Sequence, residues 1–290
     1  MNGEFWPTPA SQPIIFRMDG DSELEIFGKI LADACSAGKI TLKHCRVARR
    51  TKDEKLLMLV SLNELIRKCE SVLAMLRDDA WAGIGTVSRS CFETFADIRN
   101  LAARGRPYSD YMLWMSLEQE RSGLQGILNH PESNYSVSME ERTKSKYGKT
   151  LSQIIEDTKS TMNSIADSLP EEYKDKNGGV LKSDFQRFEL ADLVTEYNVL
   201  YRRLSGGAHG RVSDMVDGIV EEDGIVWPPD ELPDPPLAAV DCLCAILLEA
   251  TGRVCKSLGK TNAHVKPIVR AHAGAKRGLG GKQLRDGLTN

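Results

Sequence analysis

The feature that most constrains this chain is a long apolar stripe at helical spacing between Asp53 and Arg77. Apolar side chains recur there every three or four residues, which is the period of one face of an α-helix. The positions are Leu56, Leu59, Val60, Leu62, Ile66, Cys69, Val72, Leu73 and Leu76. Such a wide stripe needs other helices to cover it, so the segment predicts an all-α protein.

The same spacing recurs along most of the chain. Further helices are predicted over residues 21–37, 79–103, 109–128, 138–169, 183–205 and 237–258. Short connections between helices favour an up-and-down antiparallel bundle. The only strand-like piece is 216–227, where two short apolar runs flank an acidic turn ending in Gly224, which predicts a small β-hairpin.

Composition divides the chain into three regions. Residues 1–20 carry three prolines and no clear period, which predicts a flexible arm. Residues 21–258 form the predicted helical bundle. Residues 259–290 are glycine-rich and basic, a composition poorly suited to burying a core, and are predicted to be a disordered tail.

Charge and cysteine usage narrow the class of protein. The net charge of −3 excludes a general polyanion binder and leaves only local basic surfaces, such as residues 259–290. We find no signal peptide and no apolar run of roughly 20 residues, so we expect a cytoplasmic protein without a membrane partner. Seven cysteines without a C-x-x-C pattern indicate reduced thiols and no zinc site. No phosphate-loop, dinucleotide or G-x-S-x-G motif is present, and we expect no metal and no cofactor.

A charged pair stands beside the core face predicted for the helix over 79–103. That core face comprises Ile84, Val87, Cys91, Phe95 and Ile98. Arg89 and Glu93 lie on a neighbouring line of mostly small residues, which lets another element approach. One interpretation is a partly buried pair that orients a neighbour; the other is an ordinary i,i+4 ion pair.

The segment from Tyr201 to Arg211 concentrates reactive side chains at a predicted helix end. Arg202, Arg203, Ser205 and His209 supply two guanidinium groups, a hydroxyl and an imidazole, which can bind a phosphate and move a proton. The plain alternative is a pair of cations in a last helical turn, closed by a glycine cap and followed by a loop histidine.

These residues resemble two sequence patterns. Arg203 and His209 are separated by five residues, and Arg202 and His209 by six, which is similar to the R-x(4–6)-H motif of the HEPN superfamily of nucleotide-binding helical proteins. The R-S-x-x-E helix at Arg89, with the later Y-x-x-L-S-x-x-x-H segment at Tyr201, resembles an uncharacterised bacterial family of helical proteins over about 53–258.

The HEPN resemblance implies a metal-independent ribonuclease or an RNA-binding protein. It also implies a homodimer with the motif at the shared face. Arg202 or Arg203 would hold the scissile phosphate and His209 would act as general acid or base, with Arg89, Glu93 and Ser205 in support. RNA and an antitoxin or phage-defence partner are the expected partners, and the basic tail is compatible with RNA. The alternative is a non-catalytic helical interaction module in which these residues fix packing, and the sequence leaves open whether the protein is an enzyme.

Overall fold

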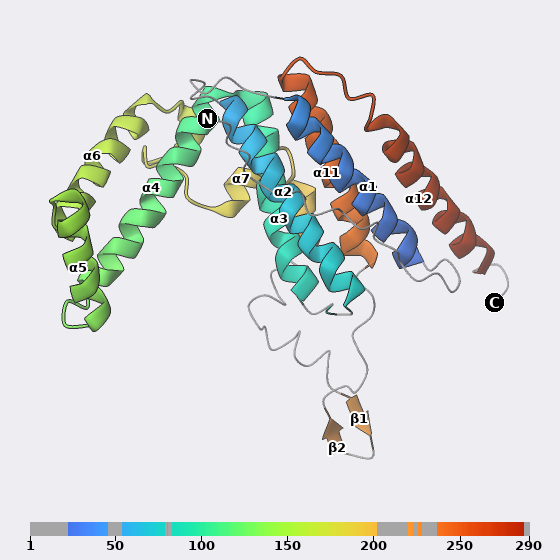
Figure 1. Ribbon diagram of the computed structural model, residues 1–290, viewed down its shortest axis with the longest axis horizontal. Helices are drawn as coiled ribbons and strands as arrows, with labels where there is room; N and C mark the ends of the chain where they lie inside the picture. The colour runs from blue at the N-terminus through green and yellow to red at the C-terminus, as the bar shows by residue number, and fades with distance from the viewer. Residues whose placement is uncertain are drawn as a thin grey trace, which may run out of the picture. The chain divides into compact units, whose positions relative to one another are not determined.

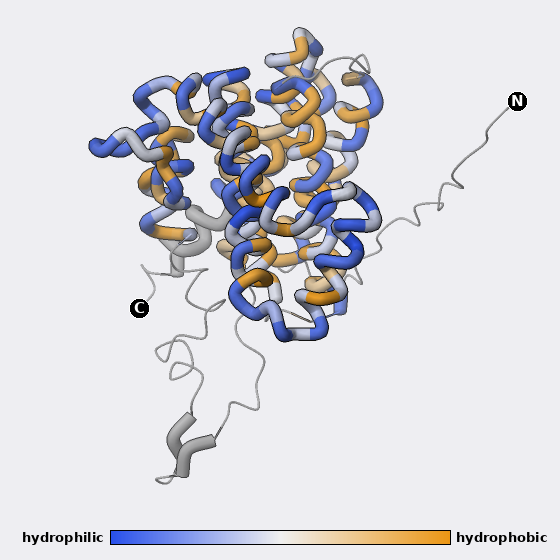
Figure 2. The backbone as a smooth tube through the Cα atoms, turned by 90° about the vertical axis from the view of Figure 1, so that its left-hand side faces the viewer, coloured by the Kyte–Doolittle hydropathy of each residue, from blue (hydrophilic) through white to orange (hydrophobic). Residues whose placement is uncertain are grey.

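The computed structural model describes residues 23–45, 54–78, 80, 83–201, 220–222, 225–227 and 237–286. Helices dominate these ranges, which confirms the predicted all-α class (Figure 1). Figure 2 shows hydrophobic and hydrophilic positions alternating along successive helical turns, as expected for helices that each cover one face.

The chain divides into two compact units, which differs from the single bundle predicted for residues 21–258. Unit 1 comprises residues 1–45, 62–95 and 200–290, and unit 2 comprises residues 46–61 and 96–199. Helices α2 (Glu54–Arg77) and α3 (Ile84–Arg104) contribute residues to both. A 24-residue helix is roughly 36 Å long, so its two ends can belong to different cores.

In unit 1, helix α1 (Glu23–His44) packs against two helices from the far end of the chain, α11 (Leu237–Ser257) and α12 (Lys266–Asp286) (Figure 1). The sequence predicted that α1 would end near Ala37, beside a glycine. The helix continues because Gly38 is a packing site: a Cβ there would lie 2.7 Å from Cδ1 of Ile66 on α2.

Buried thiols fill part of the unit 1 core. The neighbouring thiols of Cys35 on α1 and Cys91 on α3, together with burial, raise the pKa of Cys69 on α2 well above its ordinary value. The thiol therefore stays neutral and serves packing. All seven cysteines are free, in agreement with the predicted reduced thiols.

Unit 2 is built around α4 (Arg106–Leu128), which packs mainly against α6 (Leu151–Ser168) and also contacts α5 (Asn134–Tyr147). The prediction of one helix over 138–169 was wrong. Gly148, with φ 67°, ends α5, and a capping box between Thr150 and Gln153 begins α6.

Three tyrosine rings form the centre of unit 2. Tyr108 and Tyr111 of α4 meet Tyr173, the last residue of the short 3₁₀ helix η2 (Glu171–Tyr173), and all three are almost fully buried. The ring centroids of Tyr111 and Tyr173 are 5.2 Å apart. Burial, followed by the nearby Asp97 charge, raises the pKa of Tyr108 well above its ordinary value, so this phenol stays protonated.

The continuous helix predicted over 183–205 was also wrong. The chain forms α7 (Asp184–Leu190), turns at Asp192 with φ 56°, and resumes as α8 (Val194–Glu196) and the π-helical η3 (Tyr197–Tyr201). A positive φ breaks the helical hydrogen-bond pattern and resets the faces that follow. Phe188 of α7 is fully buried, whereas Val194, the first residue of α8 after the break, is exposed.

Strands β1 (Val220–Glu222) and β2 (Ile225–Trp227) pair antiparallel, with Val220 opposite Trp227. The segment predicted to be a disordered tail after Gly259 contains helix α12, which differs from that prediction. The structural reason is that Val265 and His272 are both buried against the rest of unit 1. The predicted flexible arm over 1–20 lies outside the described residues.

Candidate functional site

The residues predicted to carry chemistry fall into two groups. Arg202, Arg203, Ser205 and His209 lie outside the described residues, so their predicted roles stay predictions. Arg89 and Glu93 lie within the described part of α3, and the residue before Arg202, Tyr201, is also described.

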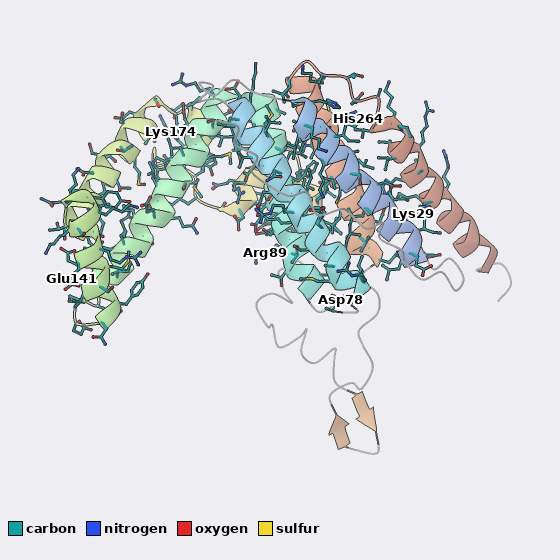
Figure 3. The ribbon with its side chains drawn as sticks, viewed as in Figure 1. Lys29, Asp78, Arg89, Glu141, Lys174 and His264 are labelled. Carbon is teal, nitrogen blue, oxygen red and sulfur yellow. The ribbon has the colours of Figure 1, made fainter. Side chains whose placement is uncertain are left out.

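Arg89 and Glu93 form the predicted ion pair. Arg89 is labelled on its helix in Figure 3, and its Nε lies 3.3 Å from Oε1 of Glu93, one turn further along α3. Their side chains are only 21% and 27% exposed. An ordinary i,i+4 pair on a helix surface is solvated and contributes about 0.3–0.5 kcal/mol. The partial burial of Arg89 and Glu93 therefore favours the interpretation of a partly buried pair over that of an ordinary surface pair.

Tyr201 docks directly on the pair. Its hydroxyl donates a 2.8 Å hydrogen bond to Oε1 of Glu93, and the guanidinium carbon of Arg89 lies 4.9 Å from the centroid of its ring. Tyr201 itself is 3% exposed. We call Arg89, Glu93 and Tyr201 the Tyr201 cluster; it joins the R-S-x-x-E helix to the first residue of the Y-x-x-L-S-x-x-x-H segment.

The neighbouring face of α3 is anchored from α2. Nζ of Lys68 donates to the Thr94 hydroxyl at 2.8 Å and to the Ser90 carbonyl at 3.4 Å. Ser88 is fully buried in place of Val87, which was predicted for the core face and is only half-buried. The Ser88 hydroxyl has no hydrogen-bond partner among the described residues. The Tyr201 cluster therefore stands on a helix held in place by packing and hydrogen bonds.

The local backbone of Tyr201 is unusual. Tyr201 closes the π-helical turn η3, which follows the break at Asp192. Single π-turns are rare and recur at functional sites because they reposition side chains relative to a regular helix. The helical periodicity used for prediction assumes a regular α-helix and cannot detect this turn.

A second buried polar network lies within unit 2, and the sequence did not point to it. Arg187 of α7 holds Asp97 of α3 through two guanidinium nitrogens, at 2.7 and 3.3 Å, and the Tyr108 hydroxyl donates to the same carboxylate at 2.6 Å. Although burial opposes the charge, Asp97 raises the pKa of Arg187 above its ordinary value. Arg187 lies 90 residues beyond Asp97 in sequence, and no spacing rule connects the two. The network satisfies its charges internally, which is the arrangement of a structural ion pair.

The described residues were also searched for metal sites and for membrane-spanning helices. Within them, no group of three or more His, Cys, Asp or Glu side chains is arranged to hold a metal ion. Nor does any helix in these ranges combine the length and apolarity needed to cross a membrane.

Comparison with protein families matches residues 56–225 to the DUF5677 family, described as a family of unknown function. The match covers more than half of the sequence, and the chain belongs to this family. It includes the whole Tyr201 cluster and the Arg202–His209 segment, and it excludes α1, α11 and α12. Comparisons with curated proteins and with solved structures gave no match.

Proposed function

We propose that the protein is a HEPN-like, metal-independent ribonuclease whose active segment is Arg202–His209. The observation that supports this is the 2.8 Å hydrogen bond from Tyr201 to Glu93. It fixes the residue that immediately precedes Arg202, and consecutive Cα atoms are about 3.8 Å apart in any trans chain. A buried, hydrogen-bonded anchor next to a reactive segment is what a preorganised site requires.

The proposed chemistry needs only side chains. His209 takes the proton from an RNA 2′-hydroxyl, whose oxygen then bonds to the adjacent phosphorus. The bond from phosphorus to the 5′-oxygen breaks, and that oxygen receives a proton from water, so the products are a 2′,3′-cyclic phosphate and a 5′-hydroxyl. Arg202 or Arg203 stabilises the charge that develops on the phosphate oxygens.

The same proposal covers the partners. We propose a homodimer with the Arg202–His209 segment at the shared face, acting on RNA as a toxin or phage-defence component with an antitoxin or defence partner. The support is the sequence resemblance together with the anchoring of Tyr201.

A non-catalytic helical interaction module is the second candidate. The 3% exposure of Tyr201 favours it, because a nearly buried tyrosine on an ion pair is also a good packing device. In that case Arg89 and Glu93 fix the chain path and Arg202–His209 performs no chemistry.

The deciding experiment incubates the purified protein with total RNA and a chelator, then assays for 2′,3′-cyclic phosphate ends. We expect cleavage that His209→Ala abolishes while leaving the thermal midpoint unchanged. His130→Ala is the matched control, because His130 is an exposed histidine at the end of α4. Absence of cyclic ends, or equal loss of cleavage and stability in His209→Ala, would overturn the nuclease proposal in favour of the module.

A further inference from the structure

The charge of this chain is strongly uneven. Residues 259–290 contain seven lysines and arginines and a single acid, Asp286. With a net charge of −3 for the whole chain, the remaining residues carry nine more acids than bases. The positive charge is therefore concentrated on and around α12, outside the DUF5677 match.

Helix α12 is held on unit 1 by its polar and apolar contacts. Nε2 of His272 lies 2.6 Å from Oδ1 of Asp241 on α11, and the His272 ring meets Phe27 of α1 edge-on at 5.8 Å. His264, labelled in Figure 3 just before α12, has its Nε2 2.8 Å from the Thr41 hydroxyl of α1. These contacts come from both neighbouring helices, so one face of α12 is committed to docking.

Three of the cations occupy the opposite face, whereas Lys276 forms an ion pair with Asp241 of α11 at 2.9 Å. At about 100° per residue, Lys266, Arg270 and Arg277 fall within about 40° of one another, on the side of the helix away from Val265 and His272. All three side chains are exposed, and none forms an ion pair within the described part of the chain. We call Lys266, Arg270 and Arg277 the α12 stripe; at 1.5 Å per residue it extends roughly 16 Å.

We infer that the α12 stripe binds the phosphate backbone of a nucleic acid, as a surface separate from the Arg202–His209 segment. Exposed guanidinium and ammonium groups aligned on a docked helix contact successive phosphates without ordering a new element. A membrane surface fits less well, because a helix that lies in a membrane needs a free apolar face, and Val265, which immediately precedes α12, and His272 are both buried in docking. RNA is the nucleic acid to test first, and this choice rests on the proposed function.

The test measures binding of a 2′-O-methyl RNA 20-mer by fluorescence anisotropy between 50 and 300 mM KCl. This RNA lacks the free 2′-hydroxyl, so binding is measured without cleavage. In Lys266→Gln/Arg270→Gln/Arg277→Gln, we expect Kd at low salt to rise by about tenfold or more. The slope of log Kd against log salt should fall by about 2, since each single-strand phosphate contact contributes about 0.7.

The matched control is Arg142→Gln/Lys144→Gln/Lys146→Gln, which removes three exposed cations from α5, where Glu140 and Glu141 offset two of the three charges. Its salt slope should stay that of the unmodified protein. Arg270→Lys/Arg277→Lys keeps the charges and should keep the slope, and circular dichroism checks that each variant retains its helices.

Binding of RNA, DNA and lipid vesicles is compared to show which phosphate-bearing partner the α12 stripe recognises. Binding of DNA of the same sequence with the same loss of slope supports backbone recognition. An unchanged slope in the α12 variant, or binding of anionic phosphatidylserine vesicles without binding of nucleic acid, overturns the inference. A reduced slope combined with absence of cyclic phosphate ends leaves the α12 inference standing while the nuclease proposal fails.

Discussion

The hydroxyl of Tyr201 tests whether the Tyr201 cluster is more than a packing device. Tyr201→Phe keeps the ring beside Arg89 and removes only the hydrogen bond to Glu93. Since hydrogen bonds to charged groups contribute about 1.5–3 kcal/mol, we expect the free energy of unfolding to fall by about 1.5 kcal/mol. If the cluster positions the segment, kcat for RNA cleavage should fall by about tenfold at unchanged KM, because small misplacements are costly in catalysis.

Two comparisons make this prediction specific. Tyr135→Phe alters an exposed tyrosine of α5 and should change neither stability nor kcat. Cleavage that falls only in proportion to the unfolded fraction would show that the Tyr201 hydroxyl is purely structural.

A carboxylate in unit 2 should set part of the acid stability. The Arg121 hydrogen bonds, with help from Lys182, lower the pKa of Glu118 from its ordinary 4.5 to about 2. A pKa lower in the folded than in the unfolded state contributes stability above about pH 4.5, and this contribution is lost as pH falls towards 2. Glu118→Gln should therefore lower the thermal midpoint at pH 7 and converge with the unmodified protein only as the pH falls to about 2 or below. The measurement is thermal unfolding across this range, with exposed Glu120→Gln as the control; a constant difference at all pH values would contradict it.

At the scale of elements, apolar spacing was a good guide wherever a segment is a regular α-helix. It predicted α2 within one residue at its N-terminus and the C-terminal end of α4 at Leu128. It failed where single residues redirect the backbone or contacts arrive from elsewhere. Gly148 ends α5 and so divides a segment predicted as one helix, whereas Gly38 lies inside α1 and does not end it. The glycine itself does not distinguish the two cases, because the role of Gly38 depends on its close approach to Ile66.

The break at Asp192 can be tested through its backbone. Aspartate tolerates φ 56° better than most residues, glycine adopts it freely, and a β-branched residue does not. Asp192→Gly should change the free energy of unfolding by less than about 1 kcal/mol, whereas Asp192→Val should lower it by about 1–3 kcal/mol. Urea unfolding measures both. Glu189→Val, at an exposed position inside α7, should cost less than about 0.7 kcal/mol; an equal cost at the two positions would remove the argument from backbone conformation.

The candidate site was predictable only in part for the same reason. The spacing of Arg89 and Glu93 placed both beside the core face of α3, and their ion pair followed from i,i+4 geometry. Their contact with Tyr201, more than a hundred residues later, depends on the path through Asp192 and η3. Long-range pairs such as Arg187 with Asp97 carry no local signal at all.

For the whole molecule, the sequence shows how the helices are spaced but not how they divide into cores. An apolar stripe shows that one face of a helix is buried, but it does not show which other helices bury it. The stripe on α2 contributes residues to both unit 1 and unit 2. The composition of residues 259–290 predicted disorder because glycine and charge dominate it. Val265 and His272 are too few to form a core by themselves, yet they suffice to dock a helix on one that exists.

The proposed assembly gives the last prediction. A shared catalytic face requires two copies, so light scattering after gel filtration should give twice the chain mass of 32.1 kDa. Because a dimer dissociates on dilution, cleavage per chain should fall below a threshold concentration, and the mass should fall over the same range. His209→Ala should dimerise as the unmodified protein does, which separates assembly from chemistry. Constant cleavage per chain through a measured fall to 32.1 kDa would place the active segment within one copy and remove the shared face from the proposal.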